Sequence, residues 1–131
     1  SRYNPWKYDI AAIAKRRLEN YAVLSDVIEQ RGDSEYITPL KSRIVPGDVP
    51  QTFPVRILRG NRDLVYDLMN KQGYGVVSLY HTLIPPLRNE EYRDSLDLSR
   101  CILNLPVHQD VDARRYKDMI KLLLDSCKST E

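Results

Sequence analysis

The chain has 131 residues, of which 42% are hydrophobic and 29% are charged, a size and composition typical of one globular domain. The formal net charge is only +2 and the charges are evenly spread, which argues against a nucleic-acid-binding surface. The sequence contains no apolar run as long as a membrane-spanning helix requires and opens with no secretory signal. We therefore expect a cytoplasmic protein, with Cys101 and Cys127 as buried, reduced thiols, although a disulfide between them stays open.

The first predicted element is a long helix over residues 6–30. Pro5 stands where the start of a helix tolerates proline, and Gly32 is suited to end the helix. Apolar residues recur at steps of three and four and predict one buried stripe: Ile10, Ile13, Ala14, Leu18, Tyr21, Ala22, Leu24, Val27 and Ile28. Charged and polar residues are expected on the other side of the helix: Lys15, Arg16, Arg17, Glu19 and Asn20.

Two strands are predicted next. Residues 36–45 form a weak candidate, because Pro39 interrupts them. Residues 53–58 alternate, with Phe53, Val55 and Ile57 on one face, and predict a second strand. Pro54 is expected there only at the start of the strand or at an edge of the sheet, because proline has no N–H to donate.

A second helix is predicted from Asn61 to about residue 72, followed by a short strand over residues 75–80. The Asn61 side chain can cap the helix, and Gly73 can end it in the left-handed conformation. Four apolar residues are expected to form the buried stripe of this helix: Leu64, Val65, Leu68 and Met69.

The last third of the chain predicts a helix over residues 89–98, a strand over residues 100–105 that Pro106 ends, and a final helix from Asp112 to about residue 126. Short strands that alternate with helices predict an α+β fold. We expect a two-layer domain with a small, mainly antiparallel sheet of three to four strands packed against helices, and with a long N-terminal helix. Residues 1–131 are expected to form a single domain.

Few residues suggest chemistry. His81 closes a strand and precedes Pro85-Pro86, a position that can either present a functional side chain or tie down the loop. His108 follows Leu105-Pro106-Val107, and we interpret this segment as mainly structural. The histidines and cysteines lack the short spacing of metal ligands, so no metal site is predicted. The sequence also lacks a phosphate-binding loop and a G-x-S-x-G elbow, so it shows no complete active site.

The order of these pieces resembles the C-terminal small domain of the sugar aminotransferase family called DegT/DnrJ/EryC1/StrS, pyridoxal-phosphate enzymes of the aspartate-aminotransferase fold, fold type I. The likeness covers nearly the whole chain and rests on short motifs in sequence order: Arg17 and Asn20, Phe53-Pro54-Val55, Arg62-Asp63-Leu64, Tyr80-His81 and the LPVHQD run over residues 105–110. The segment after the prolines departs from the family, which tends to carry a second histidine where this chain has Leu87-Arg88.

The resemblance implies a parent protein that forms a homodimer and transfers an amino group, commonly from glutamate, to a keto-sugar nucleotide. The large domain that binds pyridoxal phosphate is then absent from these residues, so the fragment holds no cofactor and is not catalytic in isolation. His81, and more weakly Arg88, are the residues expected to contact the substrate. Two alternatives stay open: a non-enzymatic binding or scaffold domain, possibly from a family member without the catalytic lysine, and a free-standing α+β domain whose likeness to the family is accidental.

Overall fold

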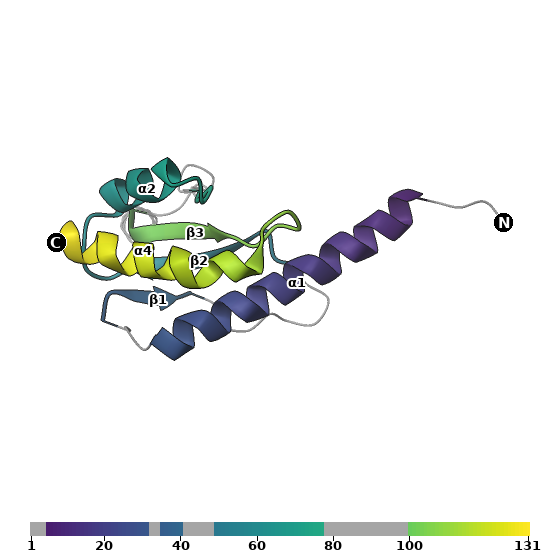
Figure 1. The fold of residues 1–131 in the computed structure, drawn as a ribbon, viewed down its shortest axis with the longest axis horizontal. Coiled ribbons are helices and arrows are strands. Elements are labelled where there is room, and N and C mark those ends of the chain that lie inside the picture. The colour runs from purple at the N-terminus through teal and green to yellow at the C-terminus, as the bar shows by residue number, and fades with distance from the viewer. Residues whose placement is uncertain (1–4, 32–34, 41–48, 78–99) are drawn as a thin grey trace, which may run out of the picture.

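The computed structural model describes residues 5–31, 35–40, 49–77 and 100–131 (Figure 1). Within these residues, three α-helices and three strands follow one another, with a short 3-10 turn before the last helix. In chain order they are α1 (Pro5–Arg31), β1 (Ile37–Pro39), β2 (Thr52–Ile57), α2 (Arg62–Lys71), β3 (Ile102–Pro106), η2 (Ala113–Arg115) and α4 (Tyr116–Ser129). The predicted α+β fold with a small antiparallel sheet and a long N-terminal helix is confirmed.

The strands form one antiparallel sheet in the order β1-β2-β3. In the central strand, Val55 pairs with Pro39 on one side and with Leu103 on the other. Of the strand predicted over residues 36–45, the structure shows β1 over Ile37–Pro39, while Tyr36 and Leu40 lie outside it and residues 41–45 are outside the described residues. In the described part of the strand predicted over residues 75–80, pairing is limited to an isolated bridge between Val77 and Asn104.

Pro54 occupies a position that the sequence did not predict. It is the third residue of β2, the central strand, so the expectation of a strand start or a sheet edge is wrong. The Pro54 carbonyl accepts a hydrogen bond from the Leu40 N–H at 3.1 Å, immediately beyond the last residue of β1. The missing N–H of Pro54 therefore falls where β1 has already ended, so a central strand tolerates the proline.

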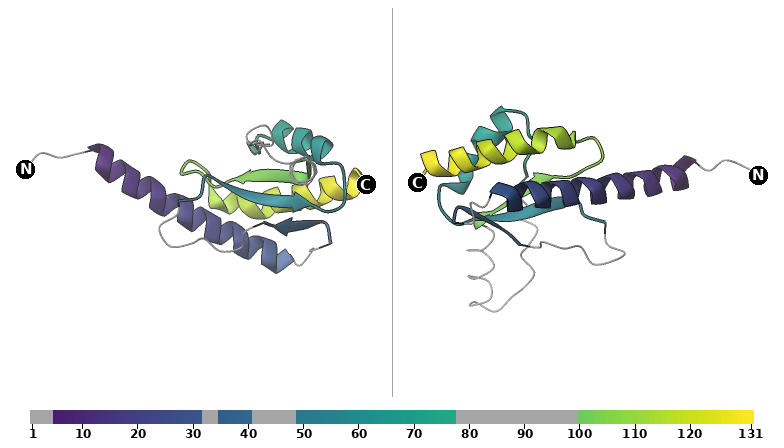
Figure 2. Two further views of the ribbon diagram at one scale, coloured as in Figure 1. Left: turned by 180° about the vertical axis from the view of Figure 1, so that it is seen from behind. Right: turned by 60° about the horizontal axis from the view of Figure 1, so that its bottom comes forward.

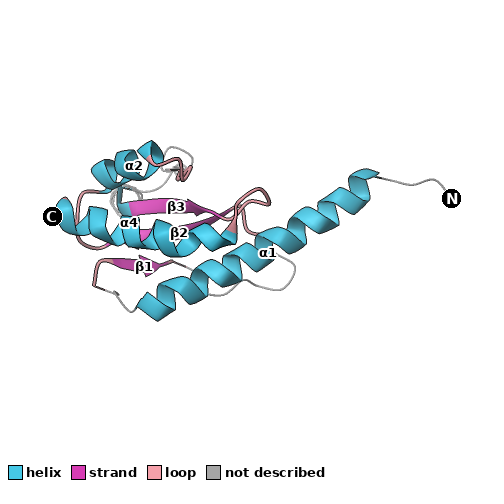
Figure 3. Cartoon of the chain, viewed as in Figure 1, coloured by secondary structure: helices cyan, strands magenta, loops and turns pink. Residues whose placement is uncertain are grey.

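The helices lie in one layer against the sheet. Figure 1 and both views of Figure 2 show α1 and α4 side by side along the sheet, and α2 packs against α4 (Figure 3). The rings of Tyr21 in α1 and Phe53 in β2 meet at 4.5 Å between centroids. Fully buried side chains from both layers form the core, which supplies most of the favourable free energy of folding: Leu24, Phe53, Val55, Val65, Met69, Leu103, Leu105, Ile120, Leu123 and Leu124.

The local signals around α2 are confirmed, but its predicted stripe is too wide. The Asn61 side chain accepts a hydrogen bond from the Leu64 N–H at 3.1 Å, as a helix cap does. Val65 and Met69 are fully buried, whereas Leu64 and Leu68 are 48% and 37% exposed. α2 contacts α4 and β3 through one narrow side. Val65 and Met69, four positions apart, occupy this side, so Leu64 and Leu68 point away from it.

The N-terminal part of α1 extends beyond the sheet (Figures 1 and 2). A helix of 27 residues is about 40 Å long. Among the α1 residues whose exposure the structure describes, 10–31, the buried apolar ones, such as Tyr21 and Leu24, lie in the C-terminal half, and Ile10 and Leu18 are 65% and 40% exposed. The prediction that the whole apolar stripe is buried is therefore wrong for its first half.

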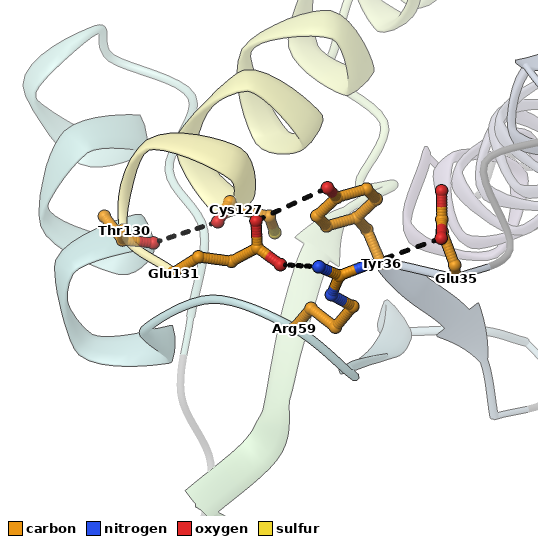
Figure 4. Close-up of polar contacts among 6 residues, drawn as sticks. All are labelled: Glu35, Tyr36, Arg59, Cys127, Thr130 and Glu131. Atoms are coloured by element: carbon orange, nitrogen blue, oxygen red, sulfur yellow. Dashed lines mark hydrogen bonds and ion pairs between the residues drawn. The ribbon is translucent and has the colours of Figure 1, made fainter.

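The end of α4 is joined to the loops that flank β1 and β2 (Figure 4). Arg59 forms ion pairs with Glu131 and, at 3.3 Å, with Glu35. The guanidinium of Arg59 also lies over the Tyr36 ring, 4.9 Å from its centroid. These charges are solvent-exposed, so each pair contributes little to stability by itself.

At Gly60 the chain passes very close to the backbone of α4. Its φ of +112° lies in the left-handed region, and a Cβ at this position would be 2.7 Å from the Cys127 carbonyl oxygen. The next residue continues the contact, because the Asn61 N–H donates to Thr130 Oγ1 at 3.0 Å. Only glycine, which has no Cβ, fits between β2 and α2 at this point.

Candidate functional site

The two residues expected to contact a substrate, His81 and Arg88, lie outside the described residues. The segment that overlaps the last motif of the family resemblance lies within the described residues. It is the run from Val107 to Asp112, which we call the 107–112 segment; it leaves β3 and leads into η2. This segment is held by hydrogen bonds from two helices.

The start of the 107–112 segment is fixed by α4. The Tyr116 hydroxyl donates a hydrogen bond to the Pro106 carbonyl at 2.8 Å, and the Tyr116 side chain is buried. Burial raises the pKa of Tyr116 above its ordinary value, so the hydroxyl keeps its proton and remains a donor. The last residue of β3 therefore cannot move without breaking a buried hydrogen bond.

The middle of the segment is fixed by α1. The Asn20 amide donates to the carbonyls of Val107 and His108, at 3.3 and 3.0 Å, and only 1% of Asn20 is exposed. The Arg17 Nε donates to the Gln109 side-chain oxygen at 3.1 Å. The buried amide of Asn20 thus satisfies two backbone carbonyls of the segment.

Arg17 and Asn20 were predicted on the solvent side of the first helix, and this prediction is wrong. Both residues lie within the helix face that meets the rest of the domain, where Asn20 is buried and Arg17 half-buried. The signal was present in the spacing, because Ile13, Arg17, Asn20, Leu24 and Val27 follow one another at steps of three and four residues.

His108 closes the turn within the segment. Its Nδ1 accepts a hydrogen bond from the Asp110 N–H at 3.3 Å, and its carbonyl accepts from the Val111 N–H at 3.0 Å. In this arrangement the neutral imidazole carries its proton on Nε2, since Nδ1 acts as the acceptor. The ring itself is exposed. These contacts agree with the structural role that the sequence suggested for this segment.

Asp112 ends the segment as a helix cap, as predicted. Its carboxylate accepts from the Arg114 N–H at 2.9 Å and from the Arg114 guanidinium at 2.9 to 3.2 Å. The hydrogen bonds from Arg114 lower the pKa of Asp112 to about 2, so its carboxylate is charged in neutral solution. The capped element is the η2 turn, which passes directly into α4.

Two hollows flank the segment. One, of about 260 Å³, lies toward the Gly73–Gly75 turn, where the Arg115 guanidinium stands 4.8 Å from the centroid of the Tyr74 ring. The other, of about 540 Å³, lies toward α1 and is lined by Arg16, Gln109, Asp110, Asp112 and Arg114 among others. Guanidinium donors and carboxylate acceptors therefore border both, and such walls suit small polar molecules more than apolar ones.

Neither cysteine is arranged as a nucleophile. Both are free thiols, with Cys127 buried and Cys101 half-buried. Burial, with a further contribution from the Glu131 charge, raises the pKa of Cys127 to about 11. The reactive thiolate form of Cys127 is consequently scarce in neutral solution.

The described residues do not fit the role of holding pyridoxal phosphate. That cofactor is bound through a lysine in a protected site. Every lysine side chain whose exposure the structure gives is exposed, and none lines either hollow: Lys15, Lys71, Lys117, Lys121 and Lys128. Among the same described ranges, no group of three or more His, Cys, Asp or Glu side chains is placed to hold a metal ion.

Comparison with known proteins leaves the family open. No protein-family model matches the chain, and a search of curated proteins finds no match either. Within the portion of the chain that the structure covers, no helix is both long and apolar enough to cross a membrane.

Proposed function

We propose that the chain is the C-terminal small domain of a cytoplasmic, pyridoxal-phosphate-dependent aminotransferase-like protein that resembles the DegT/DnrJ/EryC1/StrS family. The parent protein is a homodimer that transfers an amino group, commonly from glutamate, to a keto-sugar nucleotide. This domain closes one wall of the active site and supports the dimer. This domain contacts the substrate and shapes the active site, while the lysine that holds the cofactor belongs to another domain.

The contact between α1 and the 107–112 segment carries the proposal. Arg17 and Asn20 belong to the first motif of the resemblance, and Val107, His108 and Gln109 belong to the last. Hydrogen bonds at 3.0 to 3.3 Å join these two motifs, although most of the chain separates them in sequence. A buried amide that satisfies two carbonyls is a specific arrangement, because a missing partner would leave buried polar groups unpaired.

The fold also supports the proposal. Within the described residues, the order helix, strand, strand, helix, strand, helix is compatible with the part of the resemblance that these residues cover. Tyr116, Asn20 and Arg17 hold the 107–112 segment from two helices. A segment held in this way can form a rigid wall, as a binding site built on secondary structure requires.

The cofactor lysine gives the decisive test. The full-length protein that contains this chain is reduced with borohydride, which fixes bound pyridoxal phosphate on its lysine, and the labelled peptide is identified by mass spectrometry. We expect the label on a lysine outside these 131 residues. A protein that binds no pyridoxal phosphate, or one labelled within this chain, would overturn the proposal. A protein without the cofactor would favour the non-enzymatic binding or scaffold domain.

The substrate contacts have a separate test in the full-length enzyme. His81→Ala is expected to raise KM for the keto-sugar nucleotide about tenfold, the usual effect of one lost hydrogen bond, and Arg88→Ala to raise it less. His108→Ala is the matched control, because the His108 ring bonds within its own turn. Equal effects of His81→Ala and His108→Ala would refute the assignment of His81.

A further inference from the structure

The smaller of the two hollows beside the 107–112 segment is lined by both apolar and charged side chains. It measures about 260 Å³ and lies between this segment and the Gly73–Gly75 turn. Tyr116 and Met119 of α4 contribute to its lining and are each only 1% exposed, whereas Asp110 and Arg115, which also line it, are exposed. Sites for small molecules commonly combine apolar surface with a few polar groups that fix the orientation of the ligand.

Both walls of this hollow are held in place by the protein itself. Hydrogen bonds from α1 and α4 hold the 107–112 segment. On the opposite wall, the Asn70 side chain donates to the Val76 carbonyl at 3.2 Å and accepts from the Val76 N–H at 2.9 Å, which closes the Gly73–Gly75 turn. A Cβ at either glycine would meet nothing within 4 Å, so the turn leaves the space beside it open. A preformed hollow of this kind binds a ligand without the cost of ordering its walls.

Two opposite charges line the hollow without pairing. The Arg115 guanidinium lies over the Tyr74 ring, 4.8 Å from its centroid. Within the part of the chain that the structure describes, neither the Arg115 guanidinium nor the Asp110 carboxylate forms an ion pair or a side-chain hydrogen bond. The second carboxylate of the lining, Asp112, is already paired with Arg114. Arg115 and Asp110 are therefore both able to bind a charged group of a ligand.

These two charges restrict the chemistry of the ligand. A carboxylate can accept two parallel hydrogen bonds from a guanidinium such as Arg115. An ammonium group can donate to a carboxylate such as Asp110. A dicarboxylate or a phosphate would bring negative charge close to Asp110, and a diamine would bring positive charge close to Arg115, and like charges weaken binding. A small molecule with one ammonium group and one carboxylate matches both residues.

We propose that this hollow binds a free α-amino acid, whose carboxylate contacts Arg115 and whose ammonium group contacts Asp110. Tyr116 and Met119 supply the apolar surface against which the carbon atoms of the amino acid pack. The inference rests on the hollow and on the two charges that line it. It does not depend on the proposed aminotransferase parent, because this binding involves no cofactor.

Isothermal titration calorimetry on the full-length protein that contains this chain tests the proposal. The probes are L-alanine, L-glutamine and L-glutamate, together with succinate, which has no ammonium group, and putrescine, which has no carboxylate. The protein is first reduced with borohydride, so that any bound pyridoxal phosphate cannot react with the probes. We expect at least one of the three amino acids to bind with a Kd of about 1 mM or lower, as a ligand of about ten non-hydrogen atoms can. Succinate and putrescine should bind at least about tenfold more weakly.

Substitutions locate the binding site. Arg115→Gln and Asp110→Asn should each raise the Kd of the amino acid about tenfold or more, because each removes one charged partner. Arg16→Gln and Asp118→Asn are the matched controls and should leave the Kd unchanged, since both residues are exposed and neither lines this hollow.

Three results would overturn the proposal. The first is the absence of binding by all three amino acids up to about 10 mM, a concentration that would fill a site with the expected Kd. The second is succinate or putrescine binding as tightly as the amino acid. The third is an unchanged Kd in either Arg115→Gln or Asp110→Asn, which would place any amino acid elsewhere on the protein.

Discussion

Gly60 gives the sharpest test of the packing between the chain and α4. The Gly60→Ala substitution adds one methyl group, which would lie 2.7 Å from the Cys127 carbonyl oxygen and 2.8 Å from the Cys127 Cα. The neighbours are backbone atoms of α4, so they cannot move aside as a flexible side chain does. The φ of +112° adds a second penalty, because alanine rarely adopts it.

The two effects have separate magnitudes. A left-handed conformation costs a residue with a Cβ about 1 to 2 kcal/mol. Forcing a methyl group into a packed interior costs about 1 to 3 kcal/mol more. We therefore expect Gly60→Ala to lower the free energy of unfolding by about 2 to 5 kcal/mol, a large fraction of the stability of a small domain.

The control for this experiment is Gly73→Ala. Gly73 also has a positive φ, +80°, but nothing lies within 4 Å of the Cβ position. Its substitution should cost only the conformational term, about 1 to 2 kcal/mol. Urea unfolding followed by circular dichroism gives the free energy for both variants and for the original protein, with equal slopes expected in all three. A loss in Gly60→Ala that is no larger than in Gly73→Ala would refute the close approach to Cys127.

Three further predictions address the buried amide, the thiols and the acidic cap. Asn20→Leu removes the donor to the Val107 and His108 carbonyls and should lower the free energy of urea unfolding by about 1 to 3 kcal/mol; an unchanged midpoint would contradict the contact. Cys127, buried and with its pKa raised to about 11, should react with a thiol reagent only as the protein unfolds, whereas half-buried Cys101 reacts faster in the native state; equal native rates would argue against this packing. Because the folded-state pKa of Asp112 is lowered to about 2, its contribution to stability is present above about pH 4 and is lost as the pH falls toward 2. Thermal melts should therefore show a smaller loss over this range in Asp112→Asn than in the original protein, and identical losses would contradict the cap.

The features predicted correctly from the sequence depend on local chemistry. Asn61 caps α2 and Gly73 follows it with a positive φ, because both roles are set by the backbone within a few residues. The alternation of Phe53, Val55 and Ile57 identified β2, and all three side chains are buried. Local patterns of this kind are sufficient to predict the fold class.

The errors arise where a neighbouring element decides the outcome. Leu64 lies in the same apolar pattern as Val65, yet α4 covers only the side that carries Val65 and Met69. The predicted apolar stripe of α1 continues into its N-terminal part, but that part extends beyond the sheet, and Ile10 is 65% exposed. Helical periodicity shows which side of a helix is apolar and does not show how far a partner extends along it.

The candidate site follows the same rule. Asp112 was predicted as a cap because its partner, Arg114, is two residues away. The burial of Asn20 was missed because its amide side chain was assigned to the polar side of the helix, although its spacing with Leu24 and Val27 places it on the buried side. Its partners could not be predicted, because the carbonyls of Val107 and His108 are backbone atoms from a distant part of the chain. Both segments, the one with Arg17 and Asn20 and the 107–112 segment, belong to the resemblance, but the sequence did not predict the contact between them.

The central claim is that this chain is one domain of a larger pyridoxal-phosphate protein, and the mass of the native polypeptide tests it most directly. An antibody against this domain identifies the polypeptide in its source cells, and its mass is compared with the 15.3 kDa of the chain. The account predicts a mass well above that value, with pyridoxal phosphate recovered from the purified protein. A native polypeptide of about 15.3 kDa that binds no pyridoxal phosphate would contradict it.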